Sequence, residues 1–174
     1  MRWTRALTSV AVVLAIAGTA GCGAMGSGGE APTPPPPDPL ASVDSCSLVT
    51  PQIISQYGLD SEPMRDNDTN WAPGCTFTGK SSTVAVHRNI AETTESSEKK
   101  PVWATFNRVE VAGRSGATAV TRGSEHARAC TTMFDAGRGL VDVIVTTNNP
   151  ADQTQCQKSQ EIAKQIAPAM PPKQ

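Results

Sequence analysis

The sequence is poor in aromatic residues and contains no long apolar segment. Tyr occurs once, and Phe and Trp occur three times each, so aromatic residues make up 4% of the 174 residues. A domain with so few large apolar side chains depends more on covalent cross-links for its stability. The apolar run Ala11–Ala17 is well short of the ~20 residues that span a bilayer as a helix, which excludes a stable transmembrane segment there.

A surplus of basic charge is also missing. The chain contains 15 Lys and Arg residues against 16 Asp and Glu residues, and loss of an N-terminal segment with Arg2 and Arg5 leaves 13 against 16. Nucleic-acid-binding domains usually show a basic surplus or a basic stripe. The remaining arginines are scattered singly, at Arg88, Arg108, Arg114, Arg122, Arg128 and Arg138. We therefore expect no nucleic-acid partner.

Motifs for metal binding and catalysis are missing as well. No C-x-x-C pair occurs, and His87 and His126 are not at ligand spacing from a cysteine pair. Ser97 and Lys100 form an S-x-x-K pattern, but the S-D-N and K-T-G elements of penicillin-recognising enzymes do not occur. The surrounding "ESSEKK" is typical of a solvated surface. We predict a protein that is not an enzyme and that has no metal and no cofactor.

Two motif matches are interpreted as accidental. "GCTFTGKS", Gly74–Ser81, matches the phosphate loop G-x-x-x-x-G-K-[ST], which needs a helix beginning at the Lys-Ser. Here Thr76–Thr78 and the following "STVAVH" alternate as strands, so we predict a strand, a hairpin turn and no bound nucleotide. "DNDTN", Asp66–Asn70, opens like a calcium loop, but Trp71 stands where the loop needs glycine.

The N-terminus has the parts of a secretory signal peptide, since a basic start and an apolar run are followed by small residues. The sequence "TAGC" resembles the lipobox of bacterial lipoproteins, in which the cysteine becomes the lipidated first residue of the mature chain. We predict a signal peptide at residues 1–21 and lipidation at Cys22. The alternative is ordinary secretion, with cleavage after Ala20 or Ala24 and an unmodified cysteine.

The segment after Cys22 contains almost nothing that could form a core. It is rich in Gly and Ser, which give flexibility, and the Pro34–Pro37 run favours extended polyproline geometry. We predict a tether at residues 22–43, a single exported domain at residues 44–170 and a short tail at residues 171–174. The predicted domain is within the usual size range and long enough for a core.

Four cysteines remain in the predicted domain: Cys46, Cys75, Cys130 and Cys156. An even number in an exported domain indicates disulfides, and four cysteines allow three pairings. Sequential pairing is favoured, Cys46 with Cys75 and Cys130 with Cys156. It closes two loops of moderate length, each worth about 3 kcal/mol in the chain-entropy model.

Sequence periodicity predicts an α+β domain. Thr50 is a typical N-cap, Pro51 takes the first helical position and Gly58 follows the end of a short amphipathic helix. A second helix is predicted from Asn149 to Ala167. Between the helices, alternating segments predict about five or six mostly antiparallel strands: "CTFTG", "STVAVHRNI", "ATFNRVEVAG", "SGATAVTRG", "ACTTMFDAGRG" and "LVDVIVTTN". "SEPMRDNDTNWAPG" is predicted to be a polar loop, and "AETTESSEKKP" a surface loop or frayed helix.

The order "DSCSLVTPQIISQYGL", "GCTF", "VEVAGRSGATAV", "AC" before a strand pair and "QCQKSQEIAKQIAPAMP" resembles the Lpr/Lpp-type lipoproteins of actinobacteria. Their exported domain is the domain of unknown function 3558. The resemblance covers nearly all of the chain after the tether, and the four cysteines fall where the family pattern places them. It implies an envelope-facing lipoprotein with helices packed on a sheet, and it supplies no activity.

Two functions fit these observations. The first is a non-catalytic lipoprotein of the bacterial cell envelope, anchored to the extracytoplasmic face of the cell membrane by lipid on Cys22, that binds an envelope protein partner. The alternative is a carrier of a small amphiphile such as a lipid or glycolipid, with Trp71, Trp103 and apolar strand faces lining a pocket. A hydrolase is least favoured, because no nucleophile is found.

Overall fold

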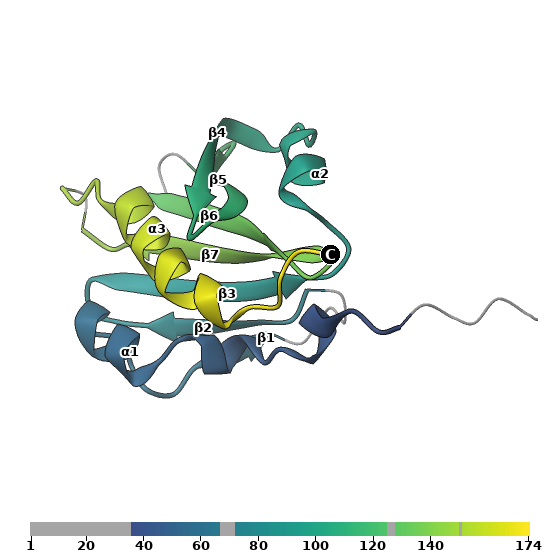
Figure 1. Ribbon diagram of the computed structural model, residues 1–174. Helices are drawn as coiled ribbons and strands as arrows, with labels where there is room; N and C mark the ends of the chain where they lie inside the picture. Colours follow the sequence, from purple (N-terminus) through teal and green to yellow (C-terminus); the bar gives the residue numbers. More distant parts are fainter. Residues whose placement is uncertain (1–35, 67–71, 125–127, 150) are drawn as a thin grey trace, which may run out of the picture. The chain divides into compact units, whose positions relative to one another are not determined.

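In the part of the chain that the structure describes, seven antiparallel strands form one sheet, with helix α3 across one face (Figure 1). The computed structural model describes residues 36–66, 72–124, 128–149 and 151–174. The elements in chain order are η1 (Pro39–Ser42), η2 (Ser45–Leu48), α1 (Pro51–Tyr57), β1 (Met64–Asp66), β2 (Gly74–Thr78), β3 (Ser82–Asn89), α2 (Thr94–Glu98), β4 (Trp103–Val111), β5 (Arg114–Thr121), β6 (Ala129–Ala136), β7 (Gly139–Thr147), α3 (Gln155–Ile166) and η3 (Ala167–Ala169), where η marks a 3-10 helix.

The sheet joins two meanders through its last strand. The strand order is β1-β2-β3-β7-β6-β5-β4, so each strand except β3 and β7 pairs only with its neighbours in sequence. Strand β7 completes the second meander and also pairs with β3 along its whole length, from Ser82 opposite Thr147 to Asn89 opposite Leu140. The connection from β3 to β4 carries α2 and runs from the middle of the sheet to its far edge.

Alternation along the strands separates two faces of the sheet. Apolar residues of β3, β6 and β7 lie under the helices, on what we call the helical face: Val84, Val86, Phe134, Val141, Val143 and Val145. The alternate residues of the same strands lie on the opposite face, which we call the open face. A second, smaller apolar cluster lies there, formed by Ala117, Ala119, Met133 and Leu140 with Trp103 and Phe106 against it.

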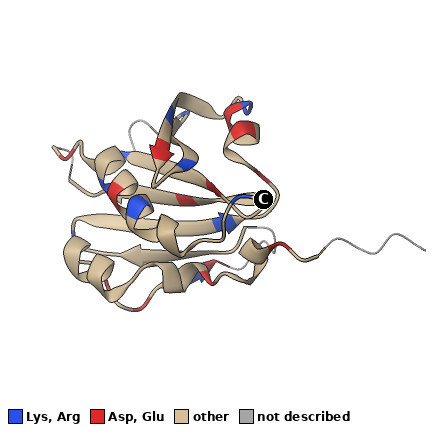
Figure 2. Cartoon of the chain, viewed as in Figure 1, with Lys and Arg blue, Asp and Glu red and all other residues tan. Residues whose placement is uncertain are grey.

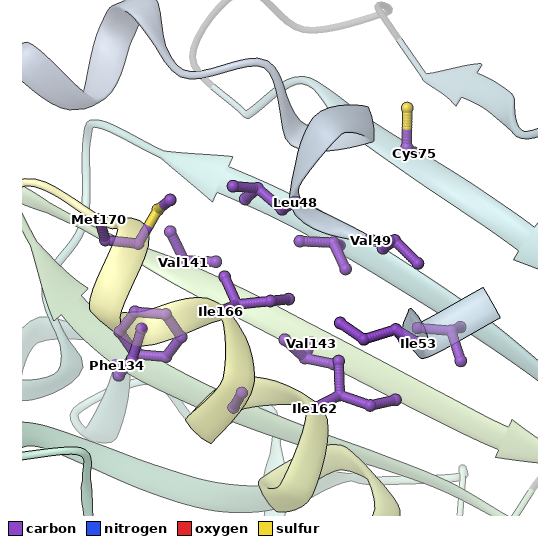
Figure 3. Packing of buried hydrophobic residues seen from close by; sticks show 14 of the residues in the cluster. Leu48, Val49, Ile53, Cys75, Phe134, Val141, Val143, Ile162, Ile166 and Met170 are labelled. Carbon is purple, nitrogen blue, oxygen red and sulfur yellow. The ribbon is translucent and has the colours of Figure 1, made fainter. Parts of the chain in front are cut away.

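Among the helices, α3 contributes the most buried residues to the core. Its Ile162, Ala163 and Ile166 are almost fully buried and meet Ile53 of α1 and the valines of β7 (Figure 3). Full burial of each isoleucine stabilises the fold by about 1.5–3 kcal/mol. The predicted second helix is therefore present and packs on the sheet.

The compact part of the chain begins at Pro36, earlier than the predicted boundary at residue 44. Asp38 caps η1 by accepting a hydrogen bond from Leu40 N at 3.0 Å, and Leu40 itself is 0% exposed. Asp38 also accepts a hydrogen bond from Arg138 N at 3.2 Å. Composition assigned this segment to the tether because its one large apolar residue stands among prolines and small residues.

The predicted tail also lies against the domain. Arg114 donates hydrogen bonds to the carbonyl oxygens of Met170 at 2.7 Å and Pro171 at 2.8 Å. Lys173 forms a 2.6 Å ion pair with the buried Asp135. Burial raises the pKa of Asp135, but the hydrogen bonds from Lys173 and Thr94 outweigh it and hold that pKa below its ordinary value.

Three elements differ from the sequence prediction. The seventh strand, β1, is short and exposed and lies inside the predicted polar loop. The N-terminal helix α1 begins at Pro51 as expected but is preceded by η1 and η2. Helix α3 begins at Gln155 rather than Asn149, since the side chains of Asn149 and Asp152 accept hydrogen bonds from backbone groups two residues later and form turns instead.

Charged residues of both signs are interspersed over the described chain (Figure 2). Examples are the ion pairs of Arg65 with Asp44 and of Lys158 with Asp152. Within residues 36–174, excluding the gaps given above, no helix combines the length and apolar character needed to cross a membrane.

Candidate functional site

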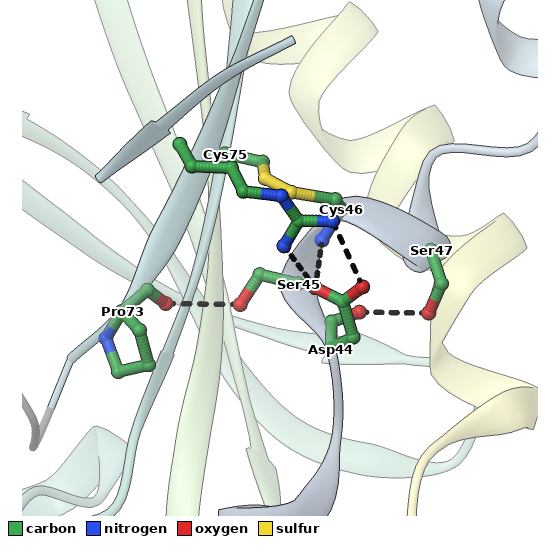
Figure 4. Close-up of a disulfide and its surroundings, with 7 residues drawn as sticks. Asp44, Ser45, Cys46, Ser47, Pro73 and Cys75 are labelled. Carbon is green, nitrogen blue, oxygen red and sulfur yellow. Dashed lines mark hydrogen bonds and ion pairs between the residues drawn. A yellow bond between two sulfur atoms is a disulfide. The ribbon is translucent and has the colours of Figure 1, made fainter. Parts of the chain in front are cut away.

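The four predicted disulfide cysteines form two bridges in the sequential pairing. Cys46 pairs with Cys75, with the Cα atoms 5.1 Å apart, and this bridge ties η2 to β2 (Figure 4). Cys130 pairs with Cys156, with a Cα separation of 5.0 Å, and ties β6 to α3. Beside the second bridge, the buried hydroxyls of Thr132 and Ser159 hydrogen-bond at 2.7 Å. Both bridges therefore fix helical segments onto the sheet.

Some predicted residues lie outside the described part of the chain. These are Cys22, the predicted lipidation site, together with His126 and Trp71. Residues 67–70 of the calcium-like stretch also lie outside it. Their roles stay predictions.

A hollow of about 330 Å³ lies on the open face. Its floor is largely apolar and comes from β6 and β7: Thr131, Met133, Leu140 and Ile144. Val102 and Trp103 form a wall next to α2. Charged side chains stand at the rim, in two pairs: His87 with Asp142, and Lys100 with Glu92. The volume is at the lower end of the range for small-molecule pockets.

The first rim pair joins neighbouring strands. His87 of β3 lies opposite Asp142 of β7 in the register, and its Nδ1 is 2.9 Å from Asp142 Oδ1. Both side chains are 20% exposed. The hydrogen bond to Asp142 raises the pKa of His87, burial opposes this shift, and the charges of Asp142 and Asp66 add to it. The raised pKa favours the imidazolium form of His87.

Gly74 makes room for the His87 ring. The two residues are paired in the register of β2 and β3, and a Cβ at Gly74 would overlap the imidazole, reaching within 2.7 Å of Nε2. Because real Cβ atoms do not approach so closely, only glycine fits here without a shift of the ring. The first residue of "GCTFTGKS" thus has a packing role, and the rest of that stretch folds as the predicted strand and turn.

The second rim pair belongs to a connection that is fastened to the sheet. Lys100 Nζ pairs with Glu92, which also accepts a hydrogen bond from Ser97 Oγ at 3.0 Å. Trp103 Nε1 donates to Ser97 O at 2.7 Å. Ser97 is 2% exposed, so the prediction that "ESSEKK" is wholly solvated is wrong at this residue. Helix α2 begins with a capping box at Thr93, and its Ser97 is buried.

Thr94 anchors this connection to β6. Its backbone N donates to Asp135 Oδ1 at 2.8 Å, and both residues are buried. The α2 wall of the hollow is therefore held at both of its ends, by Asp135 and by Trp103.

The open-face hollow presents an apolar floor and a charged rim. Each rim cation already has its own carboxylate, so the rim carries both signs in balance. No Ser, Thr or Cys side chain among the described residues hydrogen-bonds His87, which a nucleophile activated by that base would need. The described part of the chain likewise contains no group of three or more His, Cys, Asp and Glu residues placed to hold a metal ion.

Sequence reasoning placed Trp103 in a pocket and missed the pairing of His87 with Asp142. Alternation in "STVAVHRNI" and "LVDVIVTTN" puts each residue on the side of its own strand opposite the valines. Their contact needs the pairing of β3 with β7, which are 50 residues apart in the chain and are not joined by a hairpin. No local signal carries that information.

Comparison with protein families places the chain. A family model described as "Protein of unknown function (DUF3558)" matches residues 17–169. Because this match covers most of the sequence, the chain belongs to that family. No curated protein and no solved structure matches the chain. The family description assigns no activity, so the function is inferred from the residues above.

Proposed function

We propose that this protein is a lipoprotein of the bacterial cell envelope, anchored to the extracytoplasmic face of the membrane through Cys22, and that its domain is a non-catalytic binding protein. The anchor is inferred from the signal-like N-terminus and the lipobox-like "TAGC". One observation carries the binding role. It is the hollow of about 330 Å³ on the open face, with an apolar floor and two charge-balanced ion pairs at its rim.

This combination suits a partner with a small apolar group bordered by polar atoms. The floor residues Met133, Leu140 and Ile144 gain from covering by apolar surface. The rim pairs offer hydrogen bonds without adding net charge, so a protein side chain or loop fits at least as well as an ion. Such a mixture of apolar centre and polar rim is usual for protein interfaces.

The anchor is tested by Cys22→Ala in the producing cell. We expect the protein to leave the membrane fraction and to lose labelling by a palmitate analogue. Cys46→Ala serves as a matched cysteine control and should keep the label. Labelling that persists in Cys22→Ala would show that the anchor is assigned wrongly.

The binding role is tested by cross-linking in intact cells through a photoreactive amino acid at Val102, at the wall of the hollow. We expect a discrete cross-linked protein that is lost when Leu140→Glu places a charge on the floor. The same photoreactive group at Gln56, on α1 at the other face, is the positional control. If both positions give the same products, the open face is not the binding surface.

The alternative function is a carrier of a small amphiphile, and the apolar floor beside Trp103 favours it specifically. Trp103 is a natural reporter, because its indole lines the hollow. In a Trp71→Phe background, we expect a saturable change in Trp103 emission with a short-chain glycolipid. Native mass spectrometry of the purified protein should then show a bound mass. A single ligand-free mass together with unchanged emission would reject the carrier.

A further inference from the structure

A second hollow, of about 240 Å³, lies beside the first bridge at the N-terminal end of the domain. Its walls are residues 42–45, the β1 residue Arg65, residues 73–74 at the start of β2, and Arg88 of β3. None of its lining residues also lines the open-face hollow. Two arginines and one carboxylate line it, so its walls carry a net positive charge.

The carboxylate in this hollow is already engaged. Asp44 receives two parallel hydrogen bonds from Arg65, Nη1 to Oδ1 at 3.0 Å and Nη2 to Oδ2 at 3.3 Å. It also accepts a hydrogen bond from Cys46 N at 3.1 Å. The hydrogen bond from Arg65 is the main reason that the pKa of Asp44 lies below its ordinary value. This fork-to-fork geometry is the strong form of an arginine–carboxylate pair.

Among the described residues, Arg88 has no close partner for its guanidinium, although its charge acts on Asp44 and helps to lower the pKa of that carboxyl. Its backbone N donates to Pro73 O at 3.3 Å, but the described residues form no hydrogen bond or ion pair with its guanidinium. The side chain is half-buried and stands on a central strand, in register with Val141 of β7. The other arginine of the hollow, Arg65, shows what a partner here looks like, namely an anion with two oxygens facing the fork.

The geometry points to an anion site in this hollow that binds a singly charged phosphate diester, with Arg88 as its main donor. A guanidinium fork matches two oxygens of a phosphate group. The two arginines and one carboxylate of the hollow leave one net positive charge. This charge balances the single negative charge of a phosphate diester but not the two charges of an inorganic phosphate dianion. The space is large enough for the phosphate and part of its substituents. This site is separate from the open-face hollow and does not depend on its function.

The phosphate diester can come from a phospholipid headgroup or from a soluble ester. The hollow is walled by residues 42–45, close to the start of the domain and 20 residues after Cys22 at its nearest. A lipid on Cys22 would raise the local concentration of headgroups around the domain, and this preference for the lipid source rests on the proposed anchor.

The test follows the side-chain Nε–H signals of the full chain labelled with ¹⁵N-arginine, in a non-ionic detergent at constant ionic strength. With dimethyl phosphate as the probe, we expect a saturable shift of the Arg88 signal. Arg88→Gln, followed through the Arg65 signal of the same hollow, should weaken binding about tenfold or more, because a hydrogen bond to a charged group is lost. Arg88→Lys, which keeps the charge and loses the fork, should give an intermediate loss. Arg122→Gln, the same change at an exposed arginine, should stay within about twofold.

The site is rejected if the shift does not saturate, or if Arg88→Gln and Arg122→Gln weaken binding equally. A second arm compares dihexanoylphosphatidylglycerol with glycerophosphoglycerol, its soluble headgroup. Tighter binding of the lipid assigns the source to the membrane, and equal binding assigns it to a soluble ester. Both results support the phosphate site, and neither depends on whether Cys22 carries lipid.

Discussion

His87 and Asp142 face each other across the two strands that join the meanders, β3 and β7. Their hydrogen bond raises the pKa of a histidine at the rim of the open-face hollow. Histidine is well suited to this, because small changes in its surroundings move its pKa across the physiological range. The pair therefore stabilises the folded protein more at acidic pH than at alkaline pH.

Replacing His87 with glutamine should destabilise the protein most at acidic pH. The folded protein binds the His87 proton more tightly than the unfolded chain does, because Asp142 raises the pKa of the ring. The pair thus stabilises fully below the ordinary histidine value of about 6.5, and this stabilisation is lost as pH rises through the raised value. Urea unfolding should give a loss of about 1 kcal/mol at about pH 5 and a smaller loss at about pH 9.

Thr83→Gln, on the same strand and face, is the control and should show no such trend. A loss for His87→Gln that grows with pH would contradict the protonated pair.

Replacing Gly74 with alanine should cost about 1–3 kcal/mol, because the new methyl group overlaps the imidazole of His87. In a His87→Ala background the same change should cost less than about 0.5 kcal/mol, since the obstructing ring is gone. Thermal or urea unfolding of the four proteins in this cycle measures the coupling. An equal cost in both backgrounds would mean that the backbone, not the ring, requires glycine.

At the level of elements, η1 is a single turn that inserts one leucine into the core. Leu40 has no exposed surface and lies in the same apolar cluster as Ile162 of α3 and Val141 of β7. Leu40→Ala should lower the free energy of unfolding by about 2–5 kcal/mol. Val102→Ala, at a side chain that is 43% exposed, should change it by less than about 0.5 kcal/mol. A similarly small effect at Leu40 would place the segment back in the tether.

Elements that are defined by neighbouring residues in the chain could be predicted from the sequence. The Thr50 cap, Pro51 and Gly58 define α1, and the cap hydrogen bond from Ile53 N and the left-handed Gly58 are present. The alternating segments gave six of the seven strands. The short β1 could not be predicted, because its exposed residues depend on pairing with β2 rather than on their own apolar pattern.

The candidate site was predicted less well than the fold. Trp103 could be named as a pocket residue from its size and rarity. The rest of the hollow comes from strands that meet only through the β3–β7 pairing and from a connection whose inward-facing Ser97 has an ordinary polar sequence around it. Arg88 alternates with Val84 and Val86. Nothing in the sequence indicates that its guanidinium forms no hydrogen bond or ion pair with the described residues.

For the whole molecule, the two bridges hold helical segments against the two halves of the sheet. They close loops of similar length, with sequence separations of 29 and 26 residues. Replacing both cysteines of either bridge with alanine should therefore cost a similar amount, about 3 kcal/mol. Urea unfolding of the two double variants measures this, and peptide mapping under non-reducing conditions should recover the sequential pairs. Recovery of any other pair from the native protein would contradict the structure.

The two ends of the compact part of the chain meet at one turn, between β6 and β7. Asp38 accepts a hydrogen bond from Arg138 N at 3.2 Å, and Gln174 N donates to Gly137 O at 2.8 Å. Mechanical tension on the N-terminal side would therefore enter the fold at the turn of its central hairpin and not at a sheet edge. A tether of the proposed kind would therefore load, through Asp38, a hairpin whose two strands are each paired on both sides.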